Sequence, residues 1–134
     1  MMKVRMLIPS DYDAILKPWW ESWNWTAPAK DMLPEEGTGG VMISNNGINI
    51  CAGFLYYTNS KTAWLEYVVS NKEYRDNDRK EAIEYLINCL TSIANDKGYK
   101  YIYTSLKSAP LVLRYEACGF IKGDAKCQEM IKIL

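Results

Sequence analysis

Apolar and polar residues alternate in short runs along the first seventy positions, a pattern typical of half-buried β-strands. The first run, residues 3–7, leads into a short helix that Ser10 or Asp11 can cap and that Pro18 stops or kinks. After a loop rich in glycine, alternation resumes in runs separated by tight turns, over residues 41–44, 48–58 and 62–69. We predict that these three runs form an antiparallel meander, and the Asn-Gly step after the first of them favours a tight hairpin.

The second half of the chain changes to a helical period. Apolar residues recur three and four positions apart from Ala82 to Ala94, and Gly98 follows as a helix stop. A strand, a short helix and two closing strands are predicted next, over residues 99–106, 108–118, 120–124 and 129–134. The crossover from Trp64 to Leu106 predicts two parallel neighbours. Residues 1–134 thus predict one α/β (α+β) domain, ordered β-α-α-β-β-β-α-β-α-β-β, with helices flanking a mixed, mostly antiparallel sheet.

The composition limits the classes of function. The 134 residues are 49% hydrophobic and 24% charged, and the zero formal net charge gives the whole molecule no attraction for nucleic acid or anionic lipid. Basic residues that could form a local patch are dispersed among apolar and acidic neighbours; they are Lys97, Lys100, Lys107 and Arg114. No run approaches the roughly 20 apolar residues that span a membrane, and no leader pattern is present. We therefore expect a soluble, cytoplasmic protein that binds neither nucleic acid nor membrane.

The chain has no histidine, and its four cysteines lie at irregular spacing without a CxxC pair. A disulfide framework or a metal site is not expected from such a set. Catalytic machinery that pairs histidine with serine or cysteine is excluded as well. A general base near neutral pH must therefore be a carboxylate, a tyrosine, a lysine, a terminal amine or an ordered water.

A charged stretch, EYRDNDRKEA (Glu73–Ala82), joins the third strand of the meander to the long helix. Turns from a strand into a helix often bind phosphate, because free N–H groups and the helix dipole point at the ligand. Asp78 and Glu81 have the spacing of a capping box, which predicts that Asp78 occupies those N–H groups itself. Three cations in the same stretch could instead hold a phosphate by charge-assisted bonds. Both interpretations stay open at this point.

The order of elements and two local motifs resemble the GNAT superfamily of N-acetyltransferases over nearly the whole chain. The first motif, V-x-x-x-x-Y-R, contains Val69, Tyr74 and Arg75 and runs into the crossover helix. The second, Y-E-x-x-G-F, extends from Tyr115 to Phe120. The resemblance implies that acetyl-CoA binds at the strand-to-helix loop, through Val68, Val69, Arg75, Asp76, Asn77, Asp78, Arg79 and Lys80.

The loop also departs from the superfamily pattern Q/R-x-x-G-x-G/A. Arg75 fits its leading position, but Asp78 and Lys80 stand at the two glycine positions, and Asp76 stands where many members have a further glycine. Side chains at these positions narrow the approach of a pyrophosphate, and carboxylates oppose its charge. The motif is therefore only half present.

The resemblance also implies direct attack of a substrate amine on the thioester. A backbone N–H near Val68 or Val69 would hold the thioester carbonyl. Tyr115 stands where many members have a tyrosine that protonates the departing thiolate, and a phenol with a pKa of about 10 can donate at pH 7.

Glu66 is the candidate general base, since several members place a carboxylate on this strand. Strand alternation puts Glu66 on one face with Trp64 and Val68, where apolar neighbours would raise its pKa. Glu21 and Glu116 are alternative bases.

Four tryptophans lie within seven positions: Trp19, Trp20, Trp23 and Trp25. In this superfamily the first helices wall the acceptor side, so these rings are predicted to bind an aromatic or cationic amine, from a small molecule or a peptide. The alternative is a catalytically inactive GNAT-fold protein. Its Trp-rich face would then bind a partner, a small ligand or a second copy of the chain in a homodimer.

Overall fold

A five-stranded sheet lies at the centre of the computed structural model, which describes residues 1–75 and 77–134. The strands are β1 (Met2–Met6), β2 (Gly40–Asn45), β3 (Ile48–Tyr56), β4 (Thr62–Ser70) and β5 (Tyr101–Tyr103). They follow one another across the sheet in chain order. Neighbours from β1 to β4 pair antiparallel, whereas β4 and β5 pair in parallel. The predicted α/β (α+β) fold, its mostly antiparallel sheet and its parallel crossover are confirmed.

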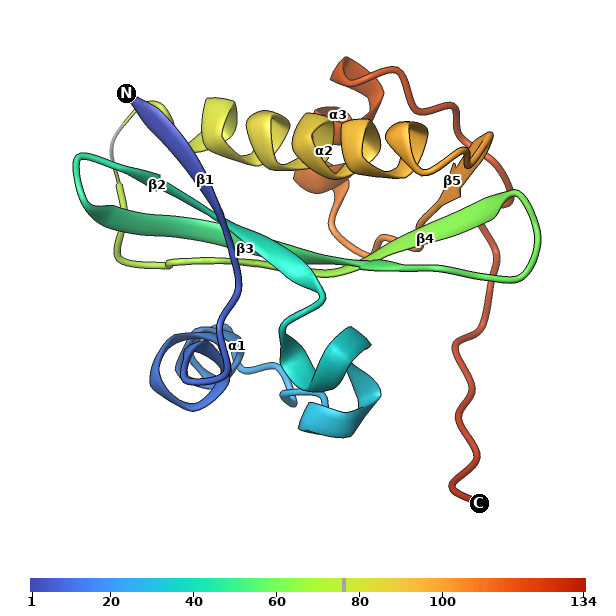
Figure 1. Cartoon of the computed structure of the whole chain (residues 1–134), viewed down its shortest axis with the longest axis horizontal. Helices are drawn as coiled ribbons and strands as arrows, with labels where there is room; N and C mark the ends of the chain where they lie inside the picture. The colour runs from blue at the N-terminus through green and yellow to red at the C-terminus, as the bar shows by residue number, and fades with distance from the viewer. Residues whose placement is uncertain (76) are drawn as a thin grey trace.

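Helices cover both faces of this sheet (Figure 1). The longer ones, α2 (Arg79–Asp96) and α3 (Ala109–Ala117), lie on one face. The opposite face carries η1 (Tyr12–Leu16), α1 (Lys17–Ser22), η2 (Lys30–Met32) and η3 (Pro34–Gly37). α2 packs closely on the sheet at Gly53, where an added Cβ would lie 3.1 Å from a methyl group of Val68 and 3.3 Å from one of Leu90. A side chain there would therefore push the helix away from β3 and β4.

The predicted tight hairpin joins β2 to β3. Asn46 and Gly47 have positive φ angles of 52° and 78°, and Asn45 pairs with Ile48 on either side of the turn. A two-residue turn of this hand needs positive φ at both central positions, which asparagine and glycine tolerate best. The Asn-Gly step therefore sets the register of the hairpin.

The first helical segment begins in a different way from the prediction. Asp11 caps no helix N–H; its carboxylate accepts two bonds from the Arg5 guanidinium, at 2.8 and 2.9 Å, and one from the N–H of Ile8 at 2.8 Å. The bonds from Arg5 hold the pKa of this buried carboxyl below its usual value, against the opposing effect of burial. Pro18 does not end the segment either. It lies in the first turn of α1, where a helix needs no N–H donor.

The prediction of two closing strands is wrong. β5 contains only three of the residues predicted for it, and residues 120–134 form no helix or strand. A strand needs the backbone groups of a neighbour along its whole length, and a three-residue edge offers few of them. The segment consequently leaves its large apolar side chains exposed, at Ile121, Met130, Ile131, Ile133 and Leu134.

The four cysteines are free thiols, with Cys51 buried in the sheet and Cys127 exposed. Burial raises the pKa of the Cys51 thiol, so this cysteine packs as a small apolar side chain. Over residues 1–75 and 77–134, no helix has both the length and the apolar character needed to cross a membrane.

Candidate functional site

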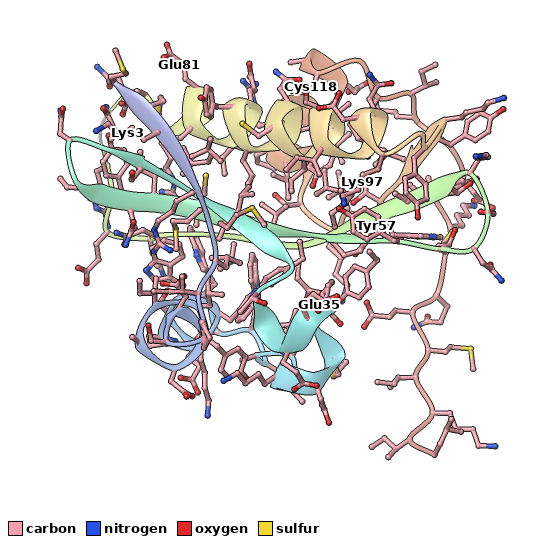
Figure 2. The ribbon with its side chains drawn as sticks, in the orientation of Figure 1. Lys3, Glu35, Tyr57, Glu81, Lys97 and Cys118 are labelled. Atoms are coloured by element: carbon pink, nitrogen blue, oxygen red, sulfur yellow. The ribbon has the colours of Figure 1, made fainter. Side chains whose placement is uncertain are left out.

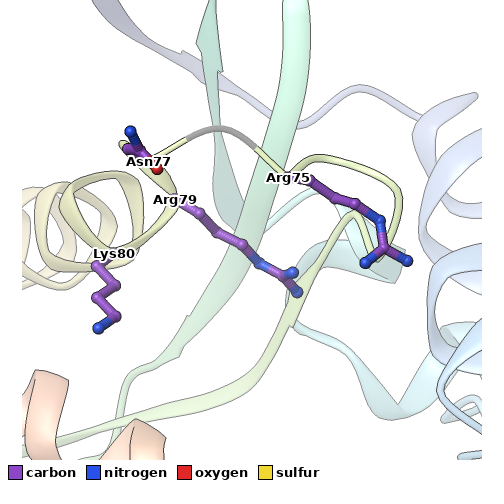
Figure 3. A pocket seen from close by; sticks show the side chains of 4 residues that line it. All are labelled: Arg75, Asn77, Arg79 and Lys80. Atoms are coloured by element: carbon purple, nitrogen blue, oxygen red, sulfur yellow. The ribbon is translucent and has the colours of Figure 1, made fainter.

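A basic pocket lies where the chain leaves β4 and enters α2 (Figure 3). It has a volume of about 440 Å³ and is lined by Arg75, Asn77, Arg79 and Lys80. All four belong to the charged loop predicted to bind acetyl-CoA; Asp76, from the same prediction, lies outside the described residues. No ion pair among the described residues engages any of the three cations. The pocket therefore has the charge needed to bind an anion.

Arg79 is the best-positioned cation of this pocket. Its guanidinium donates to the Ser70 hydroxyl at 2.8 Å and lies 5.2 Å from the ring centre of Trp23. Burial, and then the charge of Arg75, lowers the pKa of Arg79. An arginine stays protonated even so, and a bound anion would relieve this repulsion between two guanidinium groups.

Asp78 does not cap α2, contrary to the capping-box prediction. It precedes the first helical residue, but its side chain accepts no bond from the helix N–H groups. One carboxylate oxygen accepts from the Tyr74 hydroxyl at 2.6 Å, and the other from the Asn45 side-chain amide at 2.7 Å. These bonds, that of Tyr74 first, hold the pKa of Asp78 below its usual value. The carboxylate is thus turned away from the N–H groups that a phosphate would use.

Releasing Asp78 should weaken anion binding. In an Asn45→Ala/Tyr74→Phe double variant, the carboxylate can cap α2 and face the pocket, so we expect the Kd for acetyl-CoA to rise by about tenfold. Adding Asp78→Asn to the same variant should restore most of the affinity by removing the charge. Calorimetric titration of the three proteins, with thermal melts to compare folding, checks this. An unchanged Kd in the double variant would refute the role given to Tyr74 and Asn45.

A second feature is the separation of β4 from β5. The two strands pair only from Thr62 to Trp64 of β4, so no strand among residues 1–75 and 77–134 lies on that side of the rest of β4. The register with β3 also changes between Ala52 and Phe54, where two residues of β4 face Gly53, and Tyr67 has a positive φ of 57°. A bulge of this kind redirects backbone N–H groups and side chains. Val68 and Val69, the predicted carbonyl-binding region, lie on this open stretch.

Glu66 and Tyr115 approach the gap between the strands from opposite sides. Glu66 is partly buried and accepts a bond from the Ser105 N–H at 2.8 Å, across the gap. Burial raises its pKa, although the Ser105 N–H and the nearby Thr104 hydroxyl oppose the rise. Burial, chiefly, also raises the pKa of Tyr115, and the charge of Glu66 adds to this effect. At neutral pH, Tyr115 is therefore a proton donor beside a carboxylate.

The Tyr115 hydroxyl makes no hydrogen bond of good geometry within the part of the chain that the structure describes. Tyr115 is 2% exposed, and its oxygen and that of Thr104 are buried with no bond of good geometry to any described group. Thr104 is nonetheless near enough to Tyr115 and Glu66 to lower the pKa of each. A buried hydroxyl without a partner costs about 1–3 kcal/mol, so a polar ligand atom that bonded to either hydroxyl would recover that cost.

The four tryptophans differ in exposure: Trp20 is buried and cannot wall an acceptor site, and the acceptor role of the other three stays a prediction. Trp20 is buried in the core against Phe54, and Trp23 donates its indole N–H to the Ser70 carbonyl at 2.9 Å, beside the basic pocket. Trp25 stacks on Trp23 with ring centres 5.8 Å apart and is exposed, while Trp19 is partly buried. Trp23 therefore supports the anion pocket, and Trp25 is the most exposed of the four rings.

An aromatic groove instead lies beside Glu66. It has a volume of about 340 Å³ and is lined by Tyr56, Tyr57, Thr58, Trp64 and Glu66. Strand alternation predicted Trp64 and Glu66 on one face, as the structure has them, but gave no sign that Tyr56 of β3 and Tyr57 after it would join them. Alternation also predicted Val68 on that face. The bulge turns Val68 to the other side, against α2.

Known structures show which fold this arrangement belongs to. The ribosomal-protein-S18-alanine N-acetyltransferase from Escherichia coli superposes with a TM-score of 0.72 at 15% identity, over 92% of this chain and 80% of that one. Glucosamine-6-phosphate N-acetyltransferase from Arabidopsis thaliana superposes with a TM-score of 0.62 at 15% identity, over 98% of this chain and 99% of that one. AAC(6')-Iy was solved in complex with the bisubstrate analog CoA-S-monomethyl-acetylneamine. It superposes with a TM-score of 0.68 at 14% identity, over 99% of both chains.

The chain has the GNAT fold. Its sequence matches no family model and no curated protein, so the likeness to GNAT acetyltransferases lies in the structure. Identities of 14–15% leave the site to be argued from the chain's own residues. In this GNAT fold, the basic pocket and the gap between β4 and β5 lie along one strand.

Proposed function

We propose that this GNAT-fold chain is an N-acetyltransferase that transfers the acetyl group of acetyl-CoA to a primary amine. The observation that carries the proposal is the buried, unpartnered hydroxyl of Tyr115 in the gap that the Glu66 carboxylate crosses. A proton donor and a proton acceptor of this kind are what acyl transfer to an amine requires. The basic pocket at the end of the same strand supplies a separate place for the phosphates.

The residues present fit coenzyme A. Arg75, Arg79 and Lys80 would hold its pyrophosphate or 3′-phosphate, and the N–H groups at the start of α2 are left open by Asp78. When bound, acetyl-CoA supplies an activated acyl group with a thiolate as leaving group. The stretch of β4 beyond Trp64 has no strand on one side, and a free N–H there would orient the thioester carbonyl.

Two side chains then act as general base and general acid. Glu66 takes a proton from the amine, directly or through a water, as the amine nitrogen bonds to the acyl carbon. Tyr115 donates its hydroxyl proton to the sulfur as the carbon–sulfur bond breaks. Burial favours both starting states, because it raises the pKa of the base toward neutrality and keeps the phenol protonated.

The dependence of kcat/KM on pH should show the ionisation of Glu66. Because its pKa is raised, the ionised base form accumulates only above the usual range of a glutamate, so kcat/KM should rise with pH through that raised pKa. Glu66→Gln should lower kcat by about 100-fold and remove this limb, leaving only the limb of the acceptor amine. Glu116→Gln, at an exposed position on α3, is the matched control and should change neither. An unaltered profile in Glu66→Gln would move the base elsewhere.

Incubation of the purified protein with acetyl-CoA and a panel of primary amines tests the proposed activity. Release of the thiol of coenzyme A, with the N-acetylated product confirmed by mass spectrometry, is the expected result. If acetyl-CoA binds but no amine of the panel is acetylated, the catalytic proposal fails and a coenzyme-binding protein remains.

A further inference from the structure

The aromatic groove beside Glu66 carries one carboxylate on a mostly aromatic lining. Glu66 lines the groove and accepts a bond from the Ser105 N–H in the gap between β4 and β5. The other lining residues are aromatic apart from Thr58. The Tyr57 ring turns toward the end of α2, where it stacks on Tyr99 and the Lys97 ammonium is 5.1 Å from its ring centre (Figure 2). Lys97 itself does not line the groove.

The aromatic walls are held in place by contacts outside the groove. The Tyr56 hydroxyl donates to the Met32 carbonyl at 2.7 Å, so η2 fixes this ring. Trp64 stacks on Tyr103 with ring centres 5.0 Å apart and planes inclined by 28°, and Tyr57 stacks on Tyr99 at 5.4 Å. Trp64 nevertheless remains 37% exposed. Rings that are fixed but exposed offer flat faces to a ligand at little entropic cost.

We propose that this groove selects an acceptor with a single ammonium group carried on an aromatic, or similarly flat and apolar, skeleton: an arylalkylamine class of substrate. The ammonium would lie at Glu66 and the ring along Trp64 and Tyr56. This inference rests on the proposed acetyl transfer and adds the class of its acceptor.

The charges of the groove argue against a polycationic acceptor. Glu66 is the sole carboxylate among its lining residues. Glu129, from the C-terminal segment, is near enough to raise the pKa of Glu66 but does not line the groove. A second ammonium would find no further carboxylate among the lining residues. A polyamine would therefore gain an ionic partner for only one of its ammonium groups.

Competition between amines tests the inference. With acetyl-CoA saturating, kcat/KM for 2-phenylethylamine should exceed that for butylamine, spermidine and a lysine-containing peptide by about 100-fold. Trp64→Ala should lower the value for 2-phenylethylamine by about tenfold, mainly through KM, and change that for butylamine little. Trp64→Phe, which keeps a flat ring, should recover most of the loss. Tyr101→Ala, an exposed aromatic outside the groove, is the control.

Preference for spermidine or the peptide in the wild type, or equal losses for all amines in Trp64→Ala, would overturn the inference.

The two proposals can fail separately. If acetyl-CoA does not bind, the proposed function fails, and titration of 2-phenylethylamine against wild type and Trp64→Ala still tests the groove. If acetyl-CoA binds and the peptide is the best acceptor, acetyl transfer stands and the acceptor class is wrong.

Discussion

Replacing Arg79 with alanine should raise the Kd for acetyl-CoA by about 10- to 100-fold. A hydrogen bond to a charged group contributes about 1.5–3 kcal/mol, and Arg79 is already aimed into the pocket by Ser70 and Trp23. Arg75→Ala should act in the same direction, since Arg75 lines the same pocket. Isothermal titration at low ionic strength measures both, and the affinity of the wild type should fall as salt is added.

Two further variants separate a specific site from general charge. Arg79→Lys keeps the cation but loses the planar fork that binds a phosphate at two oxygens, so an intermediate Kd is expected. Lys100→Ala removes an exposed cation that does not line the pocket and should leave the Kd unchanged. Equal losses in Arg79→Ala and Lys100→Ala would mean that binding depends on net charge, and the pocket would lose its role.

The second large effect is expected from Tyr115→Phe. This change removes the proposed proton donor, so kcat should fall by about 100-fold while the Kd for acetyl-CoA stays the same. It also removes a buried hydroxyl without a partner, so the melting temperature should stay the same or rise. Steady-state kinetics and a thermal melt on one preparation measure both. Lower activity with equal or higher stability is the result that a purely structural tyrosine would not produce.

Thr104→Val is the matched control for this variant, because it removes the other unpartnered hydroxyl of the gap while keeping the shape of the side chain. We expect greater stability and a kcat within a few-fold of the wild type. If Tyr115→Phe retains full kcat with a confirmed acceptor, sulfur is protonated by another group and Tyr115 only packs against Phe120.

Short sequence patterns predicted those parts of the fold that depend on backbone sterics and on the period of apolar residues. The Asn46-Gly47 turn, the apolar stripe of α2 and the parallel crossover follow from backbone sterics and periodicity, and the structure has all three. The closing strands failed because a strand also depends on its neighbour. The alternating pattern of residues 129–134 cannot show how long the neighbouring strand is. Here that neighbour would be β5, which has only three residues and offers few backbone groups for pairing.

The candidate site shows the same division. The spacing of Asp78 and Glu81 is a local signal, but the partners of Asp78 include Asn45, which is 33 residues away and reaches it only through the sheet. The bulge at Tyr67 likewise turns Val68 to the other face, which strict alternation cannot predict. The resemblance to the GNAT superfamily pointed to Glu66 and Tyr115, whose roles stay predictions, whereas only the structure brings Tyr56 and Trp64 into one groove.

The most direct test of the account is calorimetric titration of the wild-type protein with acetyl-CoA, with an Asp76→Gly/Asp78→Gly variant alongside. We expect the wild type to bind one acetyl-CoA per chain with a micromolar Kd. If the wild type shows neither heat nor thermal stabilisation at millimolar acetyl-CoA while the glycine variant binds, the aspartates close the pocket. That result would contradict acetyl transfer by the natural sequence.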